Sequence, residues 1–164
     1  MFEIFSERAR RVVLAARIKA GERGRKSIDT ADLLAGLIVE DQAMVETTLF
    51  PKIGLGGSSF ARRPSPHTPF FSSTQAQELL DGLEKLLPQQ SEPLATTAEI
   101  PLSLSVQHAF NSAKDLQTRL QHNAIEPLHL LAAALAEESS PSVELLRNAG
   151  ITEAKVLLAL RGDA

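Results

Sequence analysis

Apolar side chains recur along the chain in steps of three and four, the spacing of one face of an α-helix. In the first such run they stand at Phe5, Ala9, Val12, Val13, Ala16 and Ala20. Ser6 lies just before this run, where a hydroxyl can accept a hydrogen bond from a free backbone N–H. Further runs predict helices near Thr30, 44–50, Thr74, Ser103, Pro127, 142–148 and 153–160. The pattern therefore predicts an all-α protein.

The predicted helix near Thr30 has an apolar face made by Leu33, Leu34, Leu37 and Ile38. Acidic residues stand between and after these positions, and on an amphipathic helix they would lie on the opposite face. We therefore expect three carboxylates to face water: Asp32, Glu40 and Asp41.

The helices are predicted in the order long, medium, short, short, and this order occurs twice. A shift of 97 residues places Ile28 on Ile125 and Glu40 on Glu137, with five identities in thirteen aligned positions. Neither copy alone has enough apolar surface to form a stable hydrophobic core. The sequence therefore predicts one eight-helix bundle, made of two four-helix repeats related by a pseudo-two-fold axis.

The boundaries follow from this repeat. The first copy takes residues 1–55 and the helix 74–88, and the second copy takes residues 100–164. A connection spans 89–99, and an insertion spans 56–73. Both copies belong to a single domain, which fits a length of 164 residues.

Composition excludes several kinds of chemistry. The chain has no Cys, Trp or Tyr, and all seven aromatic residues are Phe. Thiol chemistry is therefore excluded, and base-stacking platforms are disfavoured. The four histidines include no His-Glu-x-x-His arrangement, so solvated or helix-capping roles are the simpler interpretation. We expect no catalytic residues, no metal and no cofactor.

Basic residues are concentrated near the start of the chain. Residues 8–26 carry a net charge of +7, whereas the whole chain carries −3. This stretch either binds an anionic partner, such as nucleic acid, or is the solvated face of an amphipathic helix. No apolar run approaches the roughly 20 residues that span a bilayer, so we expect a cytoplasmic protein without a membrane partner.

Four stretches together resemble the double N-terminal domain of the Clp ATPases. They are Met1-Phe2-Glu3-x-Phe5-x-x-Arg8-Ala9-Arg10-Arg11-Val12-Val13, Ile28 ahead of Leu33-Leu34, Ile100-Pro101-Leu102-Ser103, and Ile125-Glu126-Pro127-Leu128-His129-Leu130-Leu131. The resemblance covers nearly the whole chain. It implies a non-catalytic docking module for adaptors and substrate polypeptides, which serves Clp ATPase or protease subunits.

The resemblance also implies where partners would bind, near the starts of the first helices of the two copies. The matching positions are Phe2, Glu3, Phe5, Leu102 and Gln107, with Arg8 and Arg11 nearby. For Phe5 and Leu102 the alternative is plain core packing. No Gly-x-x-x-x-Gly-Lys-Ser/Thr loop is present, so the chain resembles either a stand-alone adaptor or an N-terminal piece of a full ATPase.

Two departures from the family affect the expected ligands. Some members bind phosphorylated arginine through a glutamate in a Gly-Thr-Glu-His segment, and the glutamate positions here hold Ala31 and Leu128. We therefore expect phosphoarginine to bind weakly or not at all, unless the neighbouring acids Asp29, Asp32 or Glu126 substitute for the glutamate. The second departure is the insertion, where Phe60, Phe70 and Phe71 stand among prolines and Arg62-Arg63. We hypothesise that residues 60–71 lie against the domain or a neighbouring copy, as a tethered competitor in a client groove; the alternative is a disordered loop.

Overall fold

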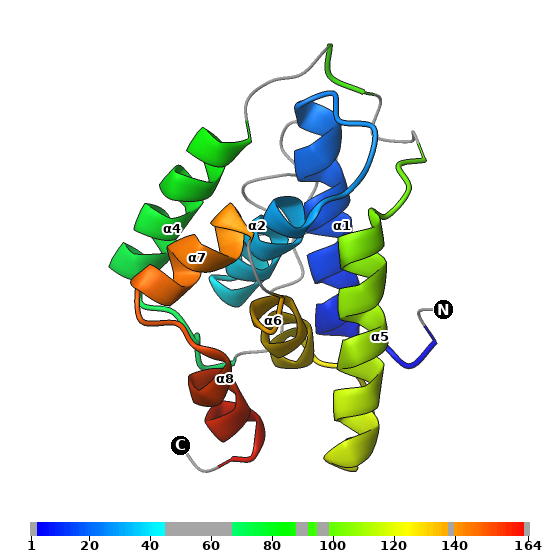
Figure 1. Cartoon of the computed structure of the whole chain (residues 1–164), viewed down its shortest axis with the longest axis vertical. Helices are drawn as coiled ribbons and strands as arrows, with labels where there is room; N and C mark the ends of the chain where they lie inside the picture. The colour runs from blue at the N-terminus through cyan, green and yellow to red at the C-terminus, as the bar shows by residue number, and fades with distance from the viewer. Residues whose placement is uncertain (1–2, 45–66, 88–91, 95–98, 138–139, 163–164) are drawn as a thin grey trace, which may run out of the picture.

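The computed structural model describes residues 3–44, 67–87, 92–94, 99–137 and 140–162 (Figure 1). Within these ranges all regular structure is helical, which confirms the all-α prediction. The helices, labelled as in Figure 1, are α1 (Glu7–Glu22), α2 (Thr30–Asp41), α4 (Ser73–Leu86), α5 (Leu104–Arg119), α6 (Pro127–Leu135), α7 (Pro141–Asn148) and α8 (Glu153–Leu160). Residues 45–50 of the helix expected at 44–50 lie outside the described ranges, so an eighth helix stays a prediction.

Short polar side chains fix where the helices begin. Ser6 Oγ accepts from the backbone N–H of Ala9 at 3.1 Å, and Ser103 Oγ accepts from that of Val106 at 3.2 Å. These contacts satisfy N–H groups that have no partner in the first turn of a helix. Helices α2 and α6 instead begin with capping boxes, in which the N-cap and N3 side chains each accept from the other residue's backbone N–H.

The predicted pseudo-two-fold relation is visible in two isolated parallel bridges. One joins Phe5 to Ile125, and the other joins Ile28 to Leu102. The shift of 97 residues turns each bridge into the other, as a two-fold axis requires. Each bridge ties the start of one copy's first helix to the segment ahead of the other copy's second helix, so the two copies form one body.

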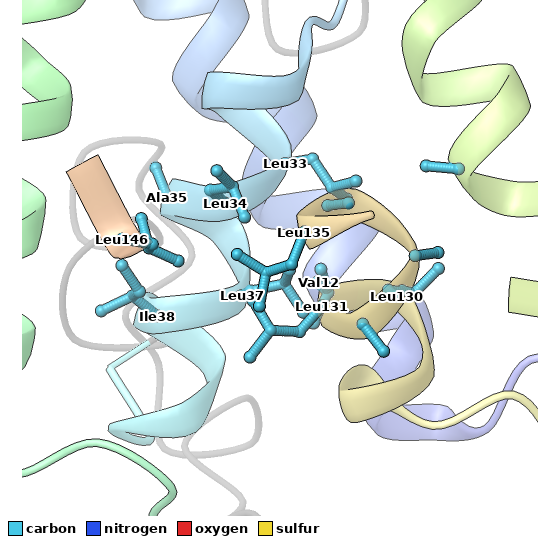
Figure 2. Close-up of a cluster of buried hydrophobic side chains, with 14 of the residues drawn as sticks. Val12, Leu33, Leu34, Ala35, Leu37, Ile38, Leu130, Leu131, Leu135 and Leu146 are labelled. Atoms are coloured by element: carbon cyan, nitrogen blue, oxygen red, sulfur yellow. The ribbon is translucent and has the colours of Figure 1, made fainter. Parts of the chain in front are cut away.

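The core is centred on α2 and α6. All twelve residues of α2 are buried, as are eight of the nine residues of α6. Figure 2 shows Leu37 of α2 facing Leu131 and Leu135 of α6, with Val12 of α1 beside them. Helices α1, α4, α5 and α7 surround this pair (Figure 1). A helix covered on every side needs apolar residues all round, which explains the nearly continuous apolar runs.

The expectation that three acidic residues of α2 face water is wrong. Asp32, Glu40 and Asp41 are 0%, 1% and 7% exposed. A single amphipathic helix would place them in solvent, but α2 has no solvent face. Each carboxylate is instead held by hydrogen bonds or ion pairs from other parts of the chain, which is the condition for burying a charge.

Helices α1 and α2 approach closely at Gly36. A Cβ added to Gly36 would lie 2.7 Å from the backbone oxygen of Val12 and 2.9 Å from the backbone nitrogen of Ala16. Only a residue without a side chain fits there. The counterpart of Gly36 in the second copy is Ala133, which carries a methyl group at the equivalent position.

Candidate functional site

Two equivalent corners of the molecule join the copies through polar side chains. At one corner Ser6 donates its hydroxyl hydrogen to Glu126 Oε2 at 2.9 Å, and at the other Ser103 donates to Asp29 Oδ1 at 3.3 Å. Each serine also caps its own helix. These four residues therefore couple helix capping to the contact between the copies.

The predicted apolar partner residues lie at these corners and mostly belong to the packing. Phe5 is 5% exposed and meets the Phe110 ring edge-on, with the ring centroids 5.3 Å apart. Leu102 is half-buried beside the core. Helices α1 and α5 run in opposite directions, so their starts lie apart rather than in one patch (Figure 1). Phe2 lies outside the described residues.

Some of the predicted polar partner residues are exposed, and others form ion pairs within the domain. Glu3 is exposed, and Gln107 is exposed while donating to the carbonyl of Leu102 at 3.0 Å. Arg11 pairs with Glu7 one turn away at 3.2 Å. Glu3, which precedes α1, and Gln107, in the first turn of α5, therefore remain accessible to a partner.

Arg8 has a structural partner. Its Nε and Nη2 atoms donate to the two oxygens of Glu40 at 2.9 and 2.8 Å. This fork-on-fork geometry matches a guanidinium to a carboxylate and compensates the burial of Glu40. The Arg8 side chain remains 31% exposed, so its outer edge still borders the surface.

Much of the basic stretch 8–26 is paired in the same way. Lys19 lies 3.8 Å from Glu84, and Arg23 and Arg25 lie 3.7 and 3.4 Å from Asp32. With Arg8 and Arg11, at least five of the eight basic residues in this stretch have carboxylate partners among the described residues. The stretch therefore presents less free positive charge than its sequence suggests.

An apolar groove lies beside the Arg8–Glu40 pair, where α1, α2 and α6 meet the segment 67–71. We call it the Arg8 groove; its enclosed volume is about 50 Å³. It is lined by Arg8, Leu37, Asp41, Thr68, Phe70, Phe71, Pro127, Leu128 and Leu131. One wall thus comes from the first copy, one from the second, and one from the end of the insertion.

Asp41 holds the segment 67–71 in place. Its carboxylate oxygens accept from the backbone N–H groups of Phe70 at 2.7 Å and Phe71 at 3.0 Å. Gln42 donates to the Phe71 carbonyl at 2.9 Å, and the His67 ring lies 3.0 Å from the Asp41 carbonyl. Phe71 is 3% exposed in the main core, whereas Phe70 is half-buried against it. Phe60 lies outside the described residues.

The capping boxes of the two copies differ in charge at one equivalent position. In the first copy the N3 residue is Asp32, which accepts from the backbone N–H of Asp29 at 3.0 Å. Burial raises the pKa of the Asp32 carboxyl, although this hydrogen bond and the nearby Arg25 and Arg23 oppose the rise. The buried carboxylate thus depends on the two guanidinium groups.

In the second copy the same position holds His129, which is fully buried. Its Nδ1 accepts from the backbone N–H of Glu126 at 2.8 Å, so in the neutral ring Nε2 carries the hydrogen. That Nε2 lies 2.8 Å from Nδ1 of His122, the counterpart of Arg25. Burial, reinforced by the His122 ring, lowers the pKa of His129 to about 4. His129 is a capping residue, one of the two roles expected from the sequence.

Comparison with known proteins decides the family. The Clp repeat (R) N-terminal domain family matches residues 72–149 and 101–162, more than half of the chain. The chain belongs to this family. The predicted resemblance is confirmed, and the match covers the whole second copy of this Clp N-domain except its last two residues. The comparison with curated protein sequences gives no match.

Solved structures share the fold over nearly the full length. The N-terminal domain of the caseinolytic protease associated chaperone ClpD from Arabidopsis thaliana has 20% identity and a TM-score of 0.63, covering 98% of this chain and 99% of that chain. A structure from a malarial protein secretion system has 17% identity and a TM-score of 0.69, covering 98% and 94%. The Hsp104 N-terminal domain from Candida albicans has 17% identity and a TM-score of 0.64, covering 99% and 94%.

The described part of this Clp N-domain shows few features of other site types. Within it, no group of three or more His, Asp and Glu side chains is placed to hold a metal ion. None of the described helices is long and apolar enough to cross a membrane. Sequence reasoning missed Asp41 as the residue that fixes the segment 67–71. The available signal was that Glu40 and Asp41 end an otherwise apolar helix, where they meet other parts of the chain.

Proposed function

We propose that this Clp N-domain is a non-catalytic docking domain that binds polypeptides and regulates their delivery to a Clp ATPase. Family membership supports the general role, and the similar ClpD domain comes from a protease-associated chaperone. The observation that carries the proposal is the Arg8 groove, which is already lined by a non-helical segment of the domain's own chain. A segment of a partner would be bound by the same contacts.

The chemistry of the groove suits a polypeptide with apolar side chains. Leu37, Leu128 and Leu131 supply apolar wall, and Asp41 supplies carboxylate oxygens that accept backbone N–H groups. Backbone contacts give affinity without regard to sequence, while the apolar wall selects the side chains. Leu128 occupies the position where phosphoarginine-binding members carry a glutamate, so we expect little affinity for phosphoarginine.

The segment 67–70 would then compete with a bound partner. Phe70 is the residue to test, because Phe71 is buried in the core and its substitution would destabilise the fold itself. We expect Phe70→Ser to strengthen binding of a labelled, permanently unfolded polypeptide, measured by fluorescence anisotropy. Leu158→Ser, which removes an exposed leucine from α8, is the matched control and should change nothing. Equal affinity for all three proteins would reject the competition.

The delivery role is tested by affinity capture from the source cell. Wild-type domain and Leu128→Asp, which places a charge in the Arg8 groove, serve as paired baits, and the bound proteins are identified by mass spectrometry. We expect Clp ATPase or protease subunits on the wild-type bait. Recovery of RNA without Clp subunits would overturn the proposal, and a gel shift with salt titration would then measure the nucleic-acid binding.

A further inference from the structure

A polar hollow of about 140 Å³ lies between α5 and α6, away from the Arg8 groove. Its rim carries Ser105, His108, Ser112 and Glu137, and three alanines form the rest of the lining. The Glu137 side chain accepts the hydroxyl hydrogen of Thr30 at 3.2 Å. Among the described residues, no basic side chain pairs with this carboxylate.

The internal repeat shows what occupies the same place in the first copy. The shift of 97 residues places Ser105 on Arg8 and Glu137 on Glu40. In the first copy the Arg8 guanidinium fills this place and bonds both oxygens of Glu40 at 2.9 and 2.8 Å. The second copy thus has the carboxylate without the arginine, and the hydroxyl of Ser105 is too short to take the place of the guanidinium.

Neighbouring substitutions keep the place open. Val12 and Val39 of the first copy are both fully buried. Their counterparts in the second copy are the smaller residues Ala109 and Ala136, which line the hollow. Smaller side chains leave volume that the helices do not close up. Arg147 donates from Nη2 to the backbone oxygens of Leu135 at 2.6 Å and Glu137 at 3.1 Å, so this guanidinium bonds to backbone rather than to the Glu137 carboxylate.

We propose that this hollow binds an arginine side chain of a docked polypeptide, with its guanidinium on the Glu137 carboxylate as Arg8 sits on Glu40. A half-buried carboxylate with one hydroxyl donor can accept a fork of two N–H groups, and this geometry favours arginine over lysine. The inference rests on the proposed function only in taking a polypeptide as the source of the arginine. It does not depend on any Clp subunit or on the Arg8 groove.

The test is a titration of the domain, followed by NMR, with the blocked peptide acetyl-Ala-Ala-Arg-Ala-Ala-amide. We expect shifts centred on the amides of Ser105, Ser112 and Glu137. The same peptide with citrulline, which has the shape of arginine without its charge, should bind at least about tenfold more weakly. A lysine peptide should also bind more weakly than the arginine peptide.

Two variants make the result specific to the hollow. Glu137→Gln removes the charge and should weaken arginine-peptide binding about tenfold, whereas Glu144→Gln removes an exposed charge from α7 and should not. Ser105→Arg restores the first copy's pair within the chain, so it should abolish peptide binding while the melting temperature stays equal or rises.

Each outcome decides the proposal. Equal affinity for the arginine and citrulline peptides, or unchanged binding in Glu137→Gln, would overturn it. Unchanged binding in a folded Ser105→Arg protein would do the same. Because the peptide titration involves no Clp subunit, its failure would leave the capture experiment, and hence the proposed function, unaffected.

Discussion

Replacing Gly36 with alanine tests the closest helix contact in the domain. The added Cβ would meet backbone atoms of α1, 2.7 Å from the Val12 oxygen and 2.9 Å from the Ala16 nitrogen. Backbone cannot rotate out of the way as a side chain can, so α1 must move by roughly half an ångström. A gap of that size costs the facing atoms about a quarter of their contact energy.

Two opposing effects set the size of the change in stability. Alanine in place of glycine favours a helix by about 1 kcal/mol. Overpacking of a core typically costs about 1–3 kcal/mol and sometimes more, and here it is imposed along the whole α1–α2 contact. We expect Gly36→Ala to lower the free energy of unfolding by about 1–2 kcal/mol. For a domain of this size that is a fall in melting temperature of roughly 2–8 °C.

Two control variants separate packing from helix propensity. Gly82→Ala makes the same exchange inside α4, where the added Cβ would meet Leu145 Cδ2 at 2.7 Å, the movable end of a half-buried side chain. It should leave stability unchanged or slightly higher. Ala133→Gly, the reverse exchange at the equivalent position, should cost about 1 kcal/mol. Thermal unfolding by circular dichroism measures all three. If Gly36→Ala is as stable as Gly82→Ala, the close approach of α1 and α2 is refuted.

Three further predictions concern charge. The pKa of His129 is 6.5 in the unfolded chain and about 4 in the folded domain. The free energy of unfolding should therefore fall by roughly 3 kcal/mol as the pH drops from 6.5 to 4, and His129 should contribute no pH dependence above pH 6.5. Urea unfolding of wild type and His129→Gln across that range isolates this ring, and identical profiles would contradict its burial. Arg8→Ala should lower the free energy of unfolding by about 2–4 kcal/mol, because Glu40 stays buried without its cation; a change under 1 kcal/mol would show that the pair is dispensable. Calorimetry should detect no ATP binding, and stoichiometric binding would refute the inference from the missing phosphate loop.

Local and repeated patterns in the sequence were enough to predict most of the fold. Ser6 caps its helix as expected, and the helix expected from Ser103 is present. The shift of 97 residues correctly pairs Phe5 and Ile28 with their counterparts. Capping and periodicity involve residues close together in the chain, which makes them readable without a structure.

The burial of charge was not predictable in the same way. Whether Glu40 faces water depends on a side chain 32 positions earlier and on helices packed around α2. Likewise, the position of Phe70 depends on Asp41, from a different element. Such long-range partners leave no periodic signal. The binding role of the residues near the starts of α1 and α5 stays a prediction, and the antiparallel packing of these helices places the two starts apart (Figure 1).

The exchange of Arg25 and Asp32 in one copy for His122 and His129 in the other limits how the two halves can evolve. An aspartate placed at 129 would face a single imidazole ring, and a histidine placed at 32 would face two guanidinium groups. The second exchange removes the buried carboxylate that Arg23 and Arg25 share, which is the costlier of the two. Each residue is thus matched to the partner in its own copy, and an exchange between the copies that moves both members of a pair together keeps the match.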